Sequence, residues 1–79
     1  MKELIEYIAK SIVSTPEDVK VTEEADEADD KNVVVVKLEV APDDKGRVIG
    51  RQGRVAEAMR TLLRVVATKE GVRVRLEIL

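Results

Sequence analysis

Apolar residues recur at helical spacing near the start of the chain. They lie at i, i+1, i+4, i+5, i+8 and i+9, which predicts a helix with one buried face. We expect Thr15 and Pro16 to end this helix, because the residue before a proline avoids the α-helical region. The apolar positions are Leu4, Ile5, Ile8, Ala9, Ile12 and Val13.

A second helical pattern begins at Arg54, and a shorter helix is expected before it. Residues 42–44, Pro-Asp-Asp, are typical of a helix start and predict a very short helix up to Ile49. Residues 50–53 separate the two helices, and Gly71 stands where the long helix should end. The apolar residues of the long helix are predicted to face the core: Val55, Ala56, Met59, Leu62, Leu63, Val66 and Ala67.

Alternation of apolar and polar residues predicts three strands. A short one covers residues 19–22, the clearest covers 33–41, and the last covers 72–79. Every even position of the middle strand is apolar. Its odd positions begin with Val33 and Val35 and then become polar, so these two valines are expected to form an apolar spot on the second face of the sheet.

The predicted order of elements is α-β-β-α-α-β, in a single domain of residues 1–79. Helices would cover one face of a three-stranded sheet, so the fold class is α+β. A chain of this length buries only about 60% of its unfolded surface, and the core is therefore thin. The sequence has fourteen valines and neither Phe nor Trp, which makes that core aliphatic.

The composition excludes several classes of function. Without Cys or His the chain has no disulfide, no thiolate metal site and no histidine base, and no catalytic constellation is visible. We therefore predict no enzyme activity, no metal and no cofactor. No run of about 18 apolar residues or signal-peptide pattern occurs, which predicts a cytoplasmic protein without a membrane partner. The single aromatic residue, Tyr7, is expected at the surface.

The net charge of −2 conceals a strong asymmetry along the chain. Residues 1–44 carry a net charge of −8, and residues 45–79 carry +6. Six acids lie within the ten residues 23–32, which are expected to form an exposed connection between strands. A basic surface is therefore possible despite the acidic total.

The strongest functional signal is the G-x-x-G sequence at residues 50–53, between the two predicted helices. Gly50 and Gly53 let the backbone turn sharply and leave no Cβ in the way of a phosphate. The unsatisfied N–H groups of the following helix point to the same place, and Gln52 can donate hydrogen bonds. Other glycine motifs do not fit, because a dinucleotide fingerprint needs a glycine where Val48 stands. Four basic residues surround this predicted anion site: Lys45, Arg47, Arg51 and Arg54.

Residues 48–55, VIGRQGRV, resemble the signature of the K-homology (KH) domain, an RNA-binding module. The α-β-β-α-α-β order is similar to the type II KH arrangement. PEDV after the first helix, APDD before the turn and KEGVRV near the end make the whole chain resemble the small bacterial KhpA family. The resemblance implies a type II KH fold, with a three-stranded mixed sheet covered on one face by helices.

The resemblance also implies a function: binding of single-stranded RNA, as an RNA chaperone or post-transcriptional regulator. Gly50 and Gly53 would let the backbone approach the phosphates, and Arg51 and Gln52 would contact the sugar-phosphate chain. The opposite wall of an aliphatic base groove is expected from strand 33–41. The other implied site residues are Val48 and Ile49 at the border of this groove, and Lys45, Arg47 and Arg54 near the phosphates.

Two alternatives to this hypothesis stay open. The glycine turn can be a plain connection between helices. Alternatively, the domain can be a protein-interaction module with weak or no RNA binding, because the resemblance implies self-association and pairing with a larger Jag-like KH protein in cell-shape and cell-wall processes. In that case Val33, Val35 and Leu79 are expected to mark an exposed contact surface.

Four further arginines give only a weak functional signal. Arg60 and Arg64 lie one turn apart on the predicted exposed side of the long helix. Arg73 and Arg75 lie on one face of the last strand. An extension of the RNA surface is one alternative for them, but we expect a solvated surface or a pair with Glu39 on a neighbouring strand.

Overall fold

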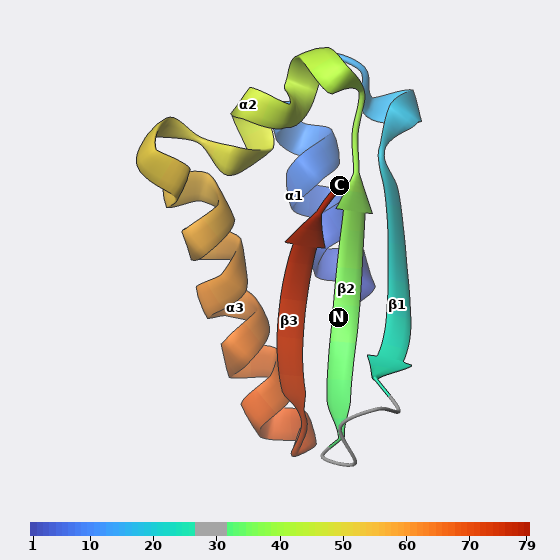
Figure 1. Cartoon of the computed structure of the whole chain (residues 1–79), viewed down its shortest axis with the longest axis vertical. Helices are drawn as coiled ribbons and strands as arrows, with labels where there is room; N and C mark the ends of the chain where they lie inside the picture. The colour runs from blue at the N-terminus through green and yellow to red at the C-terminus, as the bar shows by residue number, and fades with distance from the viewer. Residues whose placement is uncertain (27–31) are drawn as a thin grey trace.

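The fold is described from a computed structural model for residues 1–26 and 32–79 (Figure 1). Helices and strands follow one another in the predicted order, with short 3₁₀ turns (η) between them. Their bounds are α1 (Lys2–Ile12), η1 (Pro16–Asp18), β1 (Lys20–Asp26), β2 (Val33–Glu39), η3 (Pro42–Asp44), α2 (Lys45–Ile49), η4 (Arg51–Gly53), α3 (Arg54–Glu70) and β3 (Arg73–Ile78).

The three strands form one mixed sheet in the order β1-β2-β3. Strand β1 pairs antiparallel with β2, and β3 pairs parallel with β2, so that Val33 lies beside Arg73 and Leu38 beside Ile78. A parallel pair needs a crossover connection, which α2 and α3 supply here. This topology confirms the predicted α+β class and is consistent with a type II KH fold.

The helices cover one face of the sheet and leave the other face open. In Figure 1, α1 lies behind β2, α3 runs alongside β3, and the turn between α2 and α3 projects at the upper left. The described part of the molecule measures 37 × 19 × 19 Å. None of its helices is long and apolar enough to cross a membrane. The aliphatic core contains Ile5, Ala9, Val21, Val36, Leu38, Val40, Val48, Met59, Leu63 and Leu76.

Helix α1 ends earlier than predicted. It stops at Ile12, and Val13 is already extended with φ −92° and ψ 159°. The backbone N–H groups of Ser14 and Thr15 donate to the Asp44 carboxylate instead of continuing the helix. A partner about 30 residues away in sequence therefore sets the end of the helix, together with the proline that follows.

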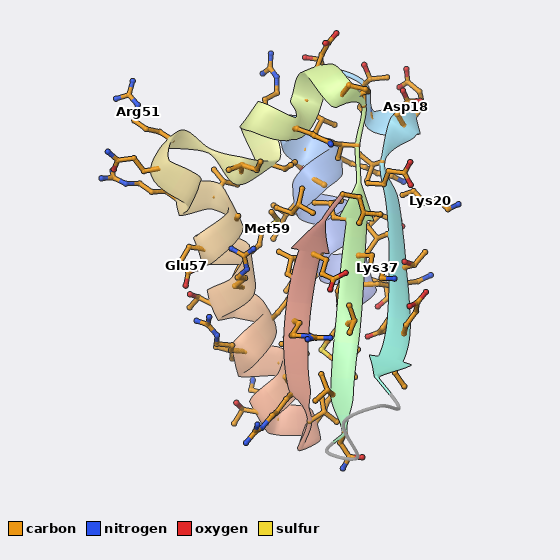
Figure 2. All side chains as sticks on the ribbon, in the orientation of Figure 1. Asp18, Lys20, Lys37, Arg51, Glu57 and Met59 are labelled. Atoms are coloured by element: carbon orange, nitrogen blue, oxygen red, sulfur yellow. The ribbon has the colours of Figure 1, made fainter. Side chains whose placement is uncertain are left out.

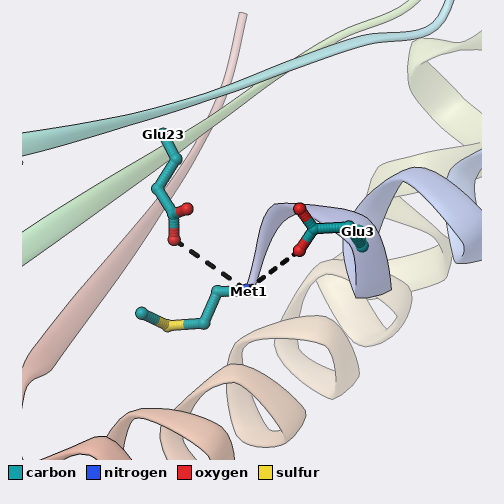
Figure 3. A network of polar contacts seen from close by, with 3 residues as sticks. All are labelled: Met1, Glu3 and Glu23. Atoms are coloured by element: carbon teal, nitrogen blue, oxygen red, sulfur yellow. Dashed lines mark hydrogen bonds and ion pairs between the residues drawn. The ribbon is translucent and has the colours of Figure 1, made fainter.

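The start of α1 is tied to β1 through the N-terminal amine (Figure 3). The Met1 nitrogen lies 3.4 Å from Glu3 Oε1 and 3.9 Å from Glu23 Oε1. The pKa of Glu3 is lowered from its ordinary value of 4.5, first by its own backbone N–H and then by the Met1 ammonium. This contact joins the two elements at the end of the sheet where α1 begins.

The predicted boundary between the first strand and the acidic connection is wrong. Strand β1 continues to Asp26, so that Glu23 to Asp26 pair with β2. Pairing with a valine-rich neighbour supplies backbone hydrogen bonds that outweigh the low strand propensity of acidic residues. The rest of the predicted connection, residues 27–31, lies outside the described residues.

The predicted apolar spot on the open face does not exist as an exposed surface. Val33 and Val35 are each only 6% exposed. They lie on the central strand, where Arg73 and Arg75 flank them from β3 and Glu24 flanks Val35 from β1. Long side chains on neighbouring strands exclude water from the central row. These two valines therefore form no contact surface, whereas Leu79 is exposed as expected.

Leu62 is another exception to the predicted core. Helix α3 buries Ala56, Met59, Leu63 and Ala67, but Leu62 is 45% exposed. Consecutive residues of a helix point about 100° apart, so Leu63 and Leu62 cannot face the same strand. Since α1 packs against β1 and β2 while α3 packs against β3, the flank of α3 that carries Leu62 is left partly uncovered.

Candidate nucleic-acid interface

The G-x-x-G turn connects the end of α2 to the start of α3 with three residues at positive φ. These are Gly50 (φ 77°, ψ 172°), Gln52 (φ 57°) and Gly53 (φ 74°). The Gly50 N–H donates to the Gly46 carbonyl at 2.8 Å, and the Gly53 N–H donates to the Gly50 carbonyl at 3.1 Å. The turn is thus a defined structure held by backbone hydrogen bonds.

Gly50 is required by space as well as by backbone conformation. A Cβ at this position would lie 2.5 Å from Val55 Cγ2 and 2.8 Å from the Val55 nitrogen. By contrast, a Cβ at Gly46 or Gly53 would meet no described atom within 4 Å. The start of α3 therefore packs directly against the backbone of the turn at Gly50.

The turn offers donors and positive charge to an anion. Within the described chain, no side chain caps the first turn of α3, so the N–H groups that follow Arg54 have no side-chain partner. The Arg54 N–H itself donates to the Arg51 carbonyl. Arg51 points away from the molecule at this end (Figure 2). Arg54 Nη2 donates to Gln52 Oε1 at 3.3 Å, which ties the two side chains together on the turn. Lys45 is also exposed.

The basic side chains of this site differ in how much of their positive charge a neighbouring acid already neutralises. Arg47 Nε lies 3.3 Å from Asp44 Oδ1, so its charge is partly neutralised. The pKa of Asp44 is lowered from its ordinary value of 3.8, first by the Ser14 N–H, and also by the Thr15 N–H and the Arg47 guanidinium. Arg47 therefore offers an anion less unbalanced positive charge than the sequence alone suggested.

The two aliphatic residues before the turn have different environments. Ile49 is exposed, as a residue bordering a groove should be. Val48 has no exposed surface and belongs to the core, which does not favour its predicted place at the border of a groove. Its position follows from the helical rotation of α2, which turns one of two neighbouring side chains inward. Val48 anchors α2 to the body of the protein.

A groove runs between α3 and β3, with two adjoining hollows of about 270 and 330 Å³. Its apolar surface comes from Leu63, Ala67, Val72, Val74 and Leu76. Arginines from the helix and the strand line it on both sides: Arg60 and Arg64, and Arg73 and Arg75. Glu77 adds one acid, and Glu57 lies 3.8 Å from Arg60 and 3.6 Å from Arg64.

Two expectations from the sequence concern this region. The strand wall of this groove is β3, whereas the sequence led us to expect strand 33–41 as the wall of a base groove. Arg73 and Arg75 are exposed, as expected for a solvated face. Arg73 and Arg75 lie beside Val33 and Val35, and neither lies opposite Glu39. The parallel pairing of β3 aligns its start with the start of β2, whereas Glu39 is at the end of β2. Both arginine pairs, Arg60 with Arg64 and Arg73 with Arg75, are visible in the sequence. Each pair alone is typical of a solvated face, so neither indicated a groove.

Known proteins resemble this chain over its full length. The family described as KhpA/KhpB, KH domain, matches residues 2–78. The RNA-binding protein KhpA of Clostridium perfringens is 48% identical over 79 residues, covering 100% of both chains. The RNA-binding proteins KhpA of Listeria monocytogenes and Aquifex aeolicus are 46% and 43% identical, covering 100% of this chain and 99% and 95% of theirs. No solved structure gives a significant match.

Proposed function

Because the chain belongs to the KhpA/KhpB KH-domain family, we propose that it binds single-stranded RNA in the cytoplasm, as an RNA chaperone or post-transcriptional regulator. One observation carries the proposal: the glycine turn and an arginine-lined apolar groove lie along the same helix, α3. Arg60, the first arginine of the groove, follows Arg54 of the turn by six residues, or about 9 Å of helix. One strand of RNA can engage both.

At the turn, the RNA backbone is the group that is bound. Gly50 and Gly53 carry no side chain, so a phosphate can approach the N–H groups at the start of α3. Arg51, exposed at the tip, neutralises the phosphate, and Lys45 and Arg54 add to the attraction. Gln52 donates hydrogen bonds to the sugar-phosphate chain without adding charge. These contacts fix the position of the strand but read no sequence.

In the groove, the bases lie against aliphatic side chains. Leu63, Val74 and Leu76 form an apolar floor that a base can cover. Ile49 is a further exposed apolar side chain, next to the turn. Arg64 and Arg73 flank the second hollow and can stack on a base or bind a phosphate. The bases of a duplex face each other and cannot enter such a hollow, so the groove favours single strands.

The number of phosphate contacts sets the expected strength of binding. The turn and the groove together can neutralise about three to five phosphates, which gives a salt slope of about −2 to −3.5 for single strands. Glu57 and Asp44 reduce the charge on three of the arginines. We therefore expect micromolar affinity at moderate salt, with little sequence preference.

The proposal is tested by fluorescence anisotropy with a short labelled single-stranded RNA at several salt concentrations. We expect binding with the negative slope given above, and at least about tenfold weaker binding of a duplex of the same sequence. Equal binding of duplex and single strand would point to a non-specific basic surface. Absence of binding at high micromolar protein and low salt would contradict the proposal.

A second candidate function is self-association, or pairing with a larger Jag-like KH protein, through the outer side of α3. Leu62 and Val65 lie three residues apart on this helix and are 45% and 51% exposed. Ala58, one turn before Leu62, is also exposed. Such a stripe at helical spacing is typical of a helix-to-helix contact. It lies apart from the arginines that face the groove, so a dimer could still bind RNA.

Sedimentation velocity over a range of protein concentrations tests this second candidate. We expect a reversible dimer that Leu62→Glu abolishes, because the substitution places a charge in an apolar contact. Tyr7→Glu, which places the same charge on a large, more exposed residue of α1, is the control and should leave the dimer intact. A wild-type protein that stays monomeric at high micromolar concentration, or equal effects of both variants, would rule out this interface.

A further inference from the structure

Asp44 is a buried carboxylate that joins two distant parts of the chain. It is only 2% exposed and lies where η3 meets α2. Its Oδ1 accepts a hydrogen bond from the Ser14 N–H, and its Oδ2 accepts one from the Thr15 N–H, both at 3.0 Å. Arg47 Nε lies 3.3 Å from Oδ1. Both oxygens are thus occupied, as a buried charge requires.

The two parts that Asp44 joins differ in how firmly they are held. Ser14 and Thr15 follow α1, which is fixed to the sheet by the fully buried Ile5 and Ala9. On the other side, α2 has five residues, too few to be stable by its own backbone hydrogen bonds. The glycine turn follows directly from the end of α2. The orientation of the turn therefore depends on the contacts that hold α2.

We propose that Asp44 is a positioning residue for RNA binding: its hydrogen bonds to Ser14 and Thr15 fix α2, and so hold the Gly50–Gly53 turn in its binding orientation. This inference rests on the proposed function. Val48 anchors the same helix from the core side, and α2 also packs against α3 and α1. The bidentate carboxylate adds a directional contact about one helical turn from Val48.

The sign of the effect on RNA affinity distinguishes positioning from simple electrostatics. Asp44 places a negative charge near the predicted phosphate site, so its removal by itself should strengthen RNA binding. If Asp44 positions the turn, its removal should weaken binding. Asn in place of Asp keeps the shape, but its amide group presents a donor where the carboxylate accepted one of the two N–H groups.

The experiment compares Asp44→Asn with Asp43→Asn, an exposed neighbour that undergoes the same chemical change. RNA affinity is measured at a temperature where circular dichroism shows both variants folded. If the turn keeps its binding orientation about a tenth of the time in Asp44→Asn, its affinity falls about tenfold. Asp43→Asn should bind as tightly as the wild type or more tightly. Unchanged or tighter binding by Asp44→Asn would overturn the inference while leaving the proposed function intact.

Two further measurements do not depend on RNA. Amide hydrogen exchange at residues 50–54 should be faster in Asp44→Asn than in Asp43→Asn, and equal rates would overturn the inference even if the wild type binds no RNA. The groups facing Asp44 are the Ser14 and Thr15 N–H groups, Arg47 and the Ser14 hydroxyl, so its pKa is lowered in the folded state. The wild type should be more stable than Asp44→Asn above about pH 4, and this difference should shrink as the pH falls through the lowered pKa. A difference that is constant with pH would contradict the carboxylate contacts.

Discussion

Replacing Gly50 with alanine should destabilise the domain by about 2–5 kcal/mol. The new Cβ would lie 2.8 Å from the Val55 nitrogen and 2.9 Å from its Cβ, so the start of α3 would have to move. The backbone at Gly50, with φ 77° and ψ 172°, is in a region that only glycine adopts readily. A chain of 79 residues has a free energy of unfolding of about 4–12 kcal/mol, so the loss is a large share of the total.

Urea denaturation of Gly50→Ala beside Gly46→Ala and Gly53→Ala measures this effect. Gly46 is helical and a Cβ there meets no described atom, so alanine should be neutral or stabilising by up to about 1 kcal/mol. Gly53 has open space but φ 74°, and alanine should cost about 1–2 kcal/mol. The order of stability should be Gly46→Ala, then Gly53→Ala, then Gly50→Ala. Equal stability of the first and last variants would show that the turn does not pack against Val55.

Replacing Arg51 with glutamate should weaken RNA binding about tenfold to fiftyfold at about 50 mM salt. One phosphate contact contributes about 0.7 to the magnitude of the salt slope, and charge reversal adds repulsion to that loss. Arg51 is exposed at the tip of the turn and points away from the core (Figure 2), so the fold should be unaffected. The salt slope should become shallower by about 0.7 or more, which anisotropy titrations at several salt concentrations will show.

The matched control is Lys20→Glu, which changes the net charge by the same amount. Lys20 lies on β1, at the opposite edge of the molecule from Arg51 (Figure 2). Exposed charges farther apart than the Debye length, about 10 Å at 0.1 M salt, interact little. Lys20→Glu should therefore change RNA affinity less than about twofold. If both variants weaken binding equally, the overall charge and not the turn controls RNA binding.

Local pattern alone predicted the order of elements and the position of the glycine turn. Helical spacing in residues 54–70 and alternation in the valine-rich strand each require only near neighbours in sequence, and both elements formed where expected. The turn at Gly50 and Gly53 was recognisable because glycine is needed there for a local reason, the positive φ. The boundaries of α1 and β1 were less accurate, because a distant carboxylate and a neighbouring strand decide them.

The sequence by itself thus determined the α+β class, the family resemblance and the glycine turn, since all of them depend on residue types at short spacing. Only the tertiary structure decided which strand faces α3, that Arg60 and Arg73 line one groove, and that Leu62 is exposed while Val33 is buried. The role of Asp44 also depends on the tertiary structure. Nothing near it in sequence distinguishes it from other acids, but packing buries its carboxylate where it accepts two backbone hydrogen bonds. The physical reason is that strand order and helix placement bring together residues tens of positions apart, which no local pattern records.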